Sequence, residues 1–201
     1  MKAVLMSIKP QWCEKIESGE KTVEIRKTKP KLDVPFKVYI YCTQDKRLLH
    51  KFNKGERIDD EHFFEEDVFV RQNTWIRGHL NPNGKVIGEF VCDWIRWEPE
   101  VADGLVDVCL SQTSCVEAGD IIRYANGKMI YSWHISDLVI YDKPKELSEF
   151  KPWNRTEDMC KYSHLGLAIP KCADCHECKI TRPPQSWCYV EEQTEENHGK
   201  E

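Results

Sequence analysis

A strand, a short helix, a glycine and a second strand are predicted to follow one another within the first 26 residues. Residues Lys2–Ile8 are nearly all apolar, as in a buried strand. Pro10 then stands where a helix tolerates proline, at its first position, and Gly19 follows the last turn as a C-terminal stop. Because the second strand starts so soon after a marked helix end, its side chains are expected to be held in a defined place.

The strand that follows Gly19 separates its side chains onto two faces. Its apolar residues point to one face, and Thr22, Glu24 and Arg26 point to the other. A guanidinium binds anions and a carboxylate accepts protons or hydrogen bonds, so this polar face has the chemistry of a ligand site. Lys21 is out of phase with Glu24, and we expect it in the turn, reaching over the same surface. The alternative is a solvated strand face with a surface ion pair worth about 0–1 kcal/mol.

Further strands are predicted along the chain, and few full-length helices separate them. Phe36–Cys42 is apolar at nearly every position, as in a strand covered on both faces, and Lys85–Trp97 has the pattern of a long strand. Residues 114–124 open with capping-box spacing and predict a helix, and residues 129–141 predict another strand or a bent pair. Five or six such strands predict an α+β fold, a small mixed β-barrel with flanking short helices and ligands on an outer cleft or rim.

Composition narrows the classes of function. The 201-residue chain carries a net charge of −5, and an isoelectric point near 5.9 argues against a broad cationic surface for duplex DNA. A local basic groove is compatible with these values. The sequence contains no long apolar run and no signal-peptide pattern, which predicts a soluble, cytoplasmic protein without a membrane partner.

The ten cysteines are expected to be thiols or metal ligands, because disulfides are rare in a reducing compartment. Gaps of two residues let neighbouring thiolates bind one metal, and a more distant cysteine completes a tetrahedron. The predicted ligands of a structural zinc are Cys172, Cys175, Cys178 and Cys188, with Cys160 or His176 as alternates. Free thiols in a loose tail and an iron–sulfur cluster are the other interpretations. The isolated Cys13, Cys42 and Cys92 are predicted to be core residues.

The opening segment resembles the ASCH-domain family, which belongs to the PUA-like superfamily. The family signature is G-x-K-x-x-E-x-R, and its four places are filled by Gly19, Lys21, Glu24 and Arg26. The preceding segment Lys9–Cys13 and the later strand Tyr131–Asp137 also fit the family pattern.

The resemblance covers roughly residues 1–145, and the charged stretch of about 44–83 is interpreted as an insertion in this barrel domain. Residues 146–201 then form a cysteine-rich extension with an acidic, disordered tail. Its segment Arg182–Val190 is similar to a tail found on some prokaryotic and phage members of the family.

The resemblance implies a groove that binds RNA, nucleotides or nucleoside-like ligands. Some small relatives are amidohydrolases that act on an acylated cytidine through the signature lysine, a nearby threonine and a distant glutamate, and another is reported as a ribonuclease. Lys21 matches that lysine, but Glu24 stands where the threonine is expected, so the hydroxyl is missing unless Thr22 or Ser7 supplies it. We therefore favour a binding protein over an enzyme. The catalytic candidates are Lys21, Glu24 and His134.

The chemistry of the residues predicts how such a groove binds its ligand. Lys21 and Arg26 can hold a phosphate, and Glu24 can accept a hydrogen bond from a base amino group or a ribose hydroxyl. Tryptophans can stack on a base, although most aromatics fill cores. The predicted ligand-binding residues are Lys21, Thr22, Glu24, Arg26, Trp12 and Trp133. The leading hypothesis is a binding protein for RNA or a nucleotide-like ligand. The alternatives are a hydrolase of a modified nucleoside or RNA, and a protein-interaction module built on a metal-bound tail.

Overall fold

The structure is a computed structural model that describes three long segments of the chain. These are residues 1–44, 84–153 and 179–193, with shorter pieces at 49–52, 54–55, 57, 68–71, 75–76 and 79–80. The charged stretch of about 44–83 also predicts one short helix near Glu61, and this position lies outside the described residues, as does most of the cysteine cluster.

The predicted opening unit is confirmed in all its parts. Strand β1 (Lys2–Ile8) leads into helix α1 (Pro10–Glu17), which begins at its proline and buries Cys13 and Ile16. Gly19 follows the helix with a φ of 78°, a left-handed conformation that glycine adopts without strain. Strand β2 (Val23–Arg26) then starts four residues later.

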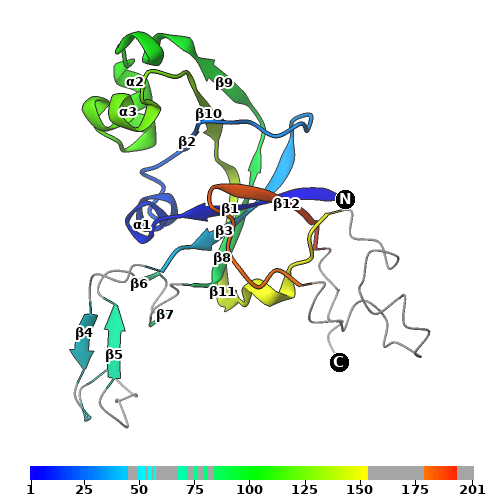
Figure 1. The fold of residues 1–201 in the computed structure, drawn as a ribbon. Coiled ribbons are helices and arrows are strands. Elements are labelled where there is room, and N and C mark those ends of the chain that lie inside the picture. The colour runs from blue at the N-terminus through cyan, green and yellow to red at the C-terminus, as the bar shows by residue number, and fades with distance from the viewer. Residues whose placement is uncertain are drawn as a thin grey trace.

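The larger sheet has five strands in the order β11-β8-β3-β1-β12 (Figure 1). Its strands besides β1 are β3 (Phe36–Cys42), β8 (Val86–Cys92), β11 (Ser136–Lys145) and β12 (Trp187–Glu191). β1 and β3 run parallel, and the other neighbours are antiparallel. Strand β12 comes from the predicted cysteine-rich extension, so that part of the extension lies within the main sheet.

The smaller sheet has the order β2-β10-β9, with β9 (Ile95–Glu98) and β10 (Ile130–His134). The bent pair predicted near residues 129–141 is confirmed, since β10 continues into β11 after one residue, Ile135. β8 (ending at Cys92) likewise continues into β9 (starting at Ile95) after a short connection. Each of these two chain segments therefore passes from one sheet to the other.

The described strands outside the predicted insertion form these two sheets and do not form the closed barrel that we predicted; the coarser α+β class is confirmed. The physical reason lies in β1, which pairs on one edge with β3 and on the other with β12. Strand β2 consequently finds no free edge of β1 to join. A side chain spans the gap instead, where the Arg26 guanidinium donates to the Ser7 carbonyl.

Three short helical elements cover the smaller sheet in Figure 1. They are the 3₁₀ helix η1 (Pro99–Asp103) and the helices α2 (Val108–Ser114) and α3 (Ala118–Ala125). The helix predicted to open at Ser114 starts later, because Cys115 has a φ of 55° and ends α2 there. Glu117 is the N-cap of α3, and Asn126 ends it at the predicted turn. A second 3₁₀ helix, η2, spans Leu147–Glu149.

Both faces of the larger sheet are covered, as predicted for Phe36–Cys42. Val38 and Ile40 pack in one core cluster with α1, whereas Tyr39 and Tyr41 pack in another with Phe150. Cys13, Cys42 and Cys92 are buried, which confirms their predicted core role. A third cluster lies between the smaller sheet and its helices.

The remaining strands lie in the predicted insertion. They are β4 (Leu49–Phe52), β5 (Val68–Arg71), β6 (Trp75–Ile76) and β7 (His79–Leu80), paired as two short antiparallel hairpins. Among the helices that the structure describes, none has the length and apolar character needed to cross a membrane.

Candidate functional site: a cationic cavity between β1 and β2

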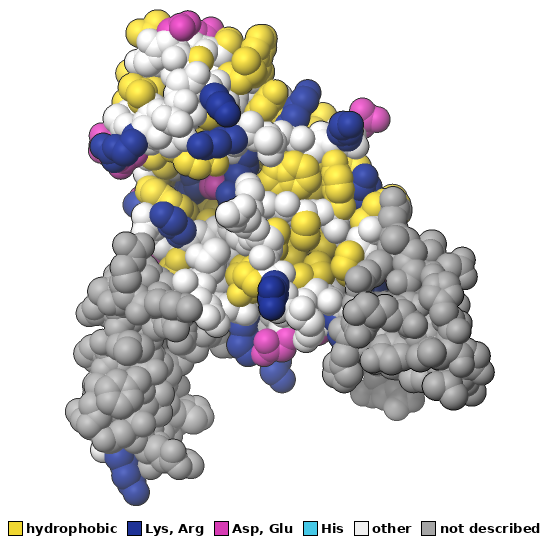
Figure 2. Space-filling model, in the orientation of Figure 1, with side chains coloured by type: hydrophobic (Ala, Val, Ile, Leu, Met, Phe, Trp, Pro, Cys, Tyr) yellow, Lys and Arg dark blue, Asp and Glu magenta, His cyan; other side chains and the backbone are white. Residues whose placement is uncertain are grey.

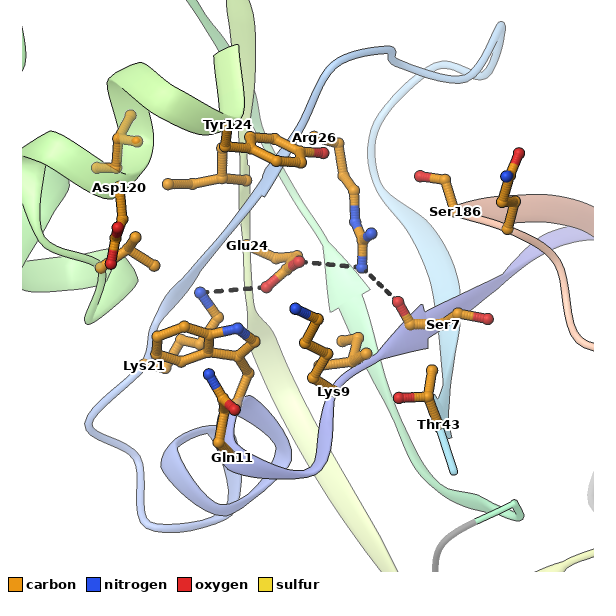
Figure 3. A pocket seen from close by; sticks show the side chains of 16 residues that line it. Ser7, Lys9, Gln11, Lys21, Glu24, Arg26, Thr43, Asp120, Tyr124 and Ser186 are labelled. Carbon is orange, nitrogen blue, oxygen red and sulfur yellow. Dashed lines mark hydrogen bonds and ion pairs between the residues drawn. The ribbon is translucent and has the colours of Figure 1, made fainter. Parts of the chain in front are cut away.

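A cavity of about 580 Å³ opens where β1 and β2 fail to pair. Its walls come from the end of β1, the start of α1, strand β2, helix α3 and the residues just before β12. Figure 2 shows a recess below the lobe of α2 and α3, with Lys and Arg side chains around it. The close view in Figure 3 shows Lys21, Glu24 and Arg26 side by side within it. The structure therefore brings these three predicted site residues, together with the predicted Trp12, into one cavity.

Lys21 is buried, with 2 % of its surface exposed, and all three protons of its ammonium have acceptors. Nζ lies 2.7 Å from the Ser114 carbonyl, 2.9 Å from the Val23 carbonyl and 3.1 Å from Oε2 of Glu24. It also lies 5.5 Å from the ring centroid of Trp12. Lys21 thus anchors the end of α2 to β2 and positions Glu24, rather than offering a free donor to a ligand.

Glu24 joins the two buried cations of the site. Its Oε2 faces Lys21, and its Oε1 lies 3.0 Å from Nη2 of Arg26. The side chain of Glu24 projects to this face because alternate residues of β2 point away from the apolar helical lobe. A buried carboxylate between two cations is well compensated in charge and stays ready to accept further hydrogen bonds.

Arg26 has an unused donor. Its Nη2 donates to the Ser7 carbonyl at 2.7 Å and to Glu24, but its buried Nε has no hydrogen-bond partner among the described residues. The residue is 9 % exposed. Leaving a buried N–H unpaired costs about 1–3 kcal/mol, so this position favours a bound water or an acceptor from a ligand.

Cations outnumber the carboxylates that line the cavity. Lys9 is exposed at its rim and adds to Lys21 and Arg26. Of the two carboxylates, Glu24 is already shared by two cations, and Asp120 is paired with Arg123 outside the cavity. The excess positive charge favours an anionic ligand.

Aromatic and hydroxyl groups complete the lining. Trp12 from α1 and Tyr124 from α3 both face the cavity, and Thr43 and Ser186 contribute hydroxyls. Burial raises the pKa of the Tyr124 phenol despite the nearby Arg26 guanidinium, so it stays a neutral donor and acceptor. We did not predict Tyr124, Thr43 or Ser186, because no local pattern distinguishes them. They reach the cavity only through the packing of distant segments.

Three other predicted residues lie elsewhere. Trp133 is fully buried in the main core, where its ring meets Phe36 at 5.7 Å, and it does not line the cavity. His134 also lies outside the cavity; it stacks on Trp94 and its Nδ1 is 2.6 Å from Asp93. Thr22 is partly buried and is not part of the cavity wall. Its backbone N–H donates to the carbonyl of residue 113.

Ser7 is one of the two residues whose hydroxyl could replace that of the missing threonine. Its hydroxyl already donates to the Pro184 carbonyl at 2.7 Å. Cys13 lies beneath the site, and burial together with the neighbouring Cys42 raises the pKa of its thiol well above its ordinary value. Both groups are therefore structural in this state of the protein.

The predicted zinc site falls mostly outside the described residues, which include only Cys188 of its proposed ligands. Cys188 lies on β12 opposite Leu5, and burial raises the pKa of its thiol to about 11. Within the part of the chain that the structure describes, no three His, Cys, Asp or Glu side chains are grouped to hold a metal. The zinc site remains a prediction.

The fold of the chain is similar to that of solved ASCH structures. The chain is similar to the crystal structure of ASCH from Zymomonas mobilis, with 16 % identity, a TM-score of 0.51 and coverage of 94 % of this chain and 88 % of that one. Two point mutants of the same protein also match, each with 15 % identity and a TM-score of 0.50. They cover 96 % and 94 % of this chain, and 92 % and 89 % of theirs.

No protein-family model matches the sequence, and no curated protein matches it. The similarity to the solved ASCH structures confirms, at the level of the fold, the resemblance that the signature residues predicted.

Proposed function

We propose that this ASCH-fold protein binds RNA, or a nucleotide-like ligand, in the cavity between β1 and β2. The observation that carries the proposal is the buried Nε of Arg26, which has no partner in the described structure and belongs to a cavity with excess positive charge. A phosphate oxygen at this position would accept from the guanidinium, and Lys9 at the rim would add a second cation. A volume of about 580 Å³ lies in the range of small-molecule sites.

The aromatic residues of the cavity support a ligand that carries a base. Trp12 and Tyr124 lie on different walls, from α1 and α3, so a base between them has a ring to stack against. Glu24 is the natural acceptor for an amino group or a ribose hydroxyl, because its contacts with Lys21 and Arg26 fix the carboxylate in place.

A hydrolase acting on a modified nucleoside or RNA is the alternative. The contacts of Lys21 support binding over that chemistry, because its ammonium already donates to two carbonyls and to Glu24. A lysine that is to accept a proton from a ligand needs a free direction on its nitrogen, and three acceptors already occupy the directions of its donors. A separate general base is then required, and His134 is not in the cavity wall.

The test is a binding titration with fluorescently labelled single-stranded RNA and with AMP, CMP, GMP and UMP. Arg26→Gln should weaken binding of whichever ligand the protein takes by about 10- to 100-fold, the effect of losing a charge-assisted hydrogen bond. Lys9→Ala, which changes an exposed side chain, should weaken it less and leave the fold intact. Lys143→Ala is the control, since Lys143 is exposed on β11 and away from the cavity wall.

Circular dichroism on each variant separates loss of binding from loss of fold. Absence of binding by the wild-type protein at millimolar ligand would overturn the proposal. So would full affinity in a folded Arg26→Gln variant. Release of a product from an acylated cytidine or from RNA, with loss of turnover in Arg26→Gln, would favour the hydrolase.

A further inference from the structure

The loop that follows β2 carries exposed lysines just beyond the cavity. Lys27 and Lys29 are exposed, and Lys27 is the chain neighbour of Arg26, which lines the cavity wall. Lys128, in the turn between α3 and β10, is exposed as well. None of these three ammonium groups has a carboxylate partner among the described residues, although the chain as a whole carries a net charge of −5. Unpaired cations gathered in an acidic protein indicate a surface for a polyanion.

Two of these lysines lie over tyrosine rings. Nζ of Lys27 lies 4.9 Å from the ring centroid of Tyr124, and Nζ of Lys29 lies 5.9 Å from that of Tyr131. Tyr124 is also part of the cavity wall, so the first of these pairs stands at the edge of the cavity. We call Lys27, Lys29 and Lys128, with the rings of Tyr124 and Tyr131, the lysine track.

The lysine track is continuous with the cavity. A second hollow of about 360 Å³ is lined by Lys27, Lys128 and Tyr131 together with Met129. Lys27 thus touches both the Tyr124 ring at the cavity and this second hollow. Figure 2 shows Lys and Arg side chains on the lobe directly above the recess. A ligand that leaves the cavity past Tyr124 meets the second hollow next.

The loop that carries the track is held by strand β12. The indole N–H of Trp187 donates to the Thr28 hydroxyl at 3.1 Å, and the backbone N–H of Lys31 donates to the Tyr189 hydroxyl at 2.6 Å. Pro30, between these two points, is buried. The lysines are therefore presented from a fixed backbone, which lowers the entropy lost when a ligand binds.

We propose that a single-stranded nucleic acid runs from the cavity along the lysine track, so that the ligand is an oligonucleotide and not a free nucleotide. The inference rests on the proposed function, since it takes the cavity as the position of one nucleotide. Ammonium groups beside aromatic rings offer contacts to both the phosphates and the unstacked bases of a single strand. A duplex hides its base faces and calls for a broader cationic surface than this acidic chain offers.

The test compares a triple variant, Lys27→Ala/Lys29→Ala/Lys128→Ala, with a charge-matched triple variant, Lys85→Ala/Lys143→Ala/Lys151→Ala. The control lysines lie outside the smaller sheet and line neither hollow. Affinities are measured for AMP and for RNA of 1, 2, 4, 6 and 10 nucleotides over a range of salt concentrations. DNA of the same sequences and poly-glutamate serve as competitors.

Wild-type affinity should rise with RNA length over about the first four nucleotides and then level off. The track variant should bind the 10-mer about 10- to 100-fold more weakly and lower the salt slope by about 2, since each lost phosphate contact removes about 0.7. Its affinity for AMP should equal that of the wild type, and the control variant should keep the full length dependence.

Two results overturn the inference while leaving the proposed function standing. One is AMP binding that depends on Arg26 with no gain in affinity for longer RNA. The other is a track variant that binds the 10-mer as the wild type does. Displacement of RNA by poly-glutamate as effective as by DNA also overturns it, because the track then selects charge alone. If neither AMP nor RNA binds the wild-type protein, the proposed function itself fails.

Discussion

Two buried glutamates lie on opposite faces of the smaller sheet, and each is 6 % exposed. Glu24 on β2 faces the cavity between β1 and β2, whereas Glu98 on β9 faces the helical lobe beside a hollow of about 510 Å³. The strand register explains the opposite orientation, because Glu24 pairs with Trp133 and Glu98 pairs with Ile130, which point to different sides of β10.

The two carboxylates differ in what compensates their charge. Glu24 has two buried cations, Lys21 and Arg26. Glu98 has Arg96 at 2.6 Å, whose side chain is 51 % exposed, and the Ser132 hydroxyl at 2.5 Å. The first arrangement has two cations for one carboxylate and, among the described residues, a buried donor without a partner. The second has a single cation, Arg96, which also lies 3.8 Å from Asp107. The comparison teaches that burial of a carboxylate does not by itself distinguish the two faces; the charge of the cations around it does, and only the face of Glu24 has the positive excess that an anionic ligand requires.

The largest effect is expected from Glu24→Gln. The substitution leaves two buried cations without their shared carboxylate, which should lower the free energy of unfolding by about 3–5 kcal/mol. It should at the same time raise the affinity of the cavity for inorganic phosphate, because the positive charge is no longer offset. Urea denaturation measures the first quantity, and isothermal titration at fixed salt measures the second.

A double variant gives the control for this prediction. Lys21→Met/Glu24→Gln removes one cation together with the carboxylate, so its loss of stability should be smaller than the sum of the two single losses. A Glu24→Gln protein whose free energy of unfolding lies within 1 kcal/mol of wild type would contradict the view of Glu24 as a buried bridge.

A smaller effect is expected from Glu98→Gln. Glutamine keeps an oxygen that accepts from Ser132, and the half-exposed Arg96 can turn to water, so the loss should be about 1–2 kcal/mol. Affinity for AMP and RNA should not change, because Glu98 lies on the other face of the sheet. Equal losses of ligand affinity in Glu98→Gln and Arg26→Gln would remove the distinction between the two faces.

The sequence predicted the elements that depend on local chemistry. Pro10 and Gly19 bound the first helix as expected, and the alternation along β2 put Glu24 and Arg26 on the face opposite Val23. The proximity of Lys21 and Glu24 also followed from this local pattern, since they are only three positions apart.

Features that depend on distant segments were not predictable in the same way. Trp133 shares the face of Glu24, yet the packing of Phe36 and Trp187 against it places it in the core. The pairing of β12 with β1 involves residues more than 180 positions apart, and it is this pairing that blocks barrel closure. The three acceptors of Lys21 include a carbonyl at residue 114, so its burial could not be inferred from the segment around it.

The smallest effect is expected at a third carboxylate, Asp93, which accepts from His134 near the surface. An exposed pair of this kind contributes about 0–1 kcal/mol, so Asp93→Asn should change stability far less than either glutamate substitution. The hydrogen bond from His134 lowers the pKa of Asp93 below its ordinary value of 3.8. The contribution of the Asp93–His134 pair to the free energy of unfolding is therefore present above pH 3.8. It is lost as the pH falls through the lowered pKa of Asp93 in the folded state.

The difference between wild type and Asp93→Asn, measured by urea denaturation, should accordingly be constant near neutral pH and shrink below pH 3.8. Asp33→Asn is the matched control, since Asp33 is exposed and has no ion pair among the described residues. A loss above about 2 kcal/mol in Asp93→Asn would exceed the range of exposed pairs. Exposure alone would then not explain a smaller contribution to stability from Asp93 than from Glu24 and Glu98.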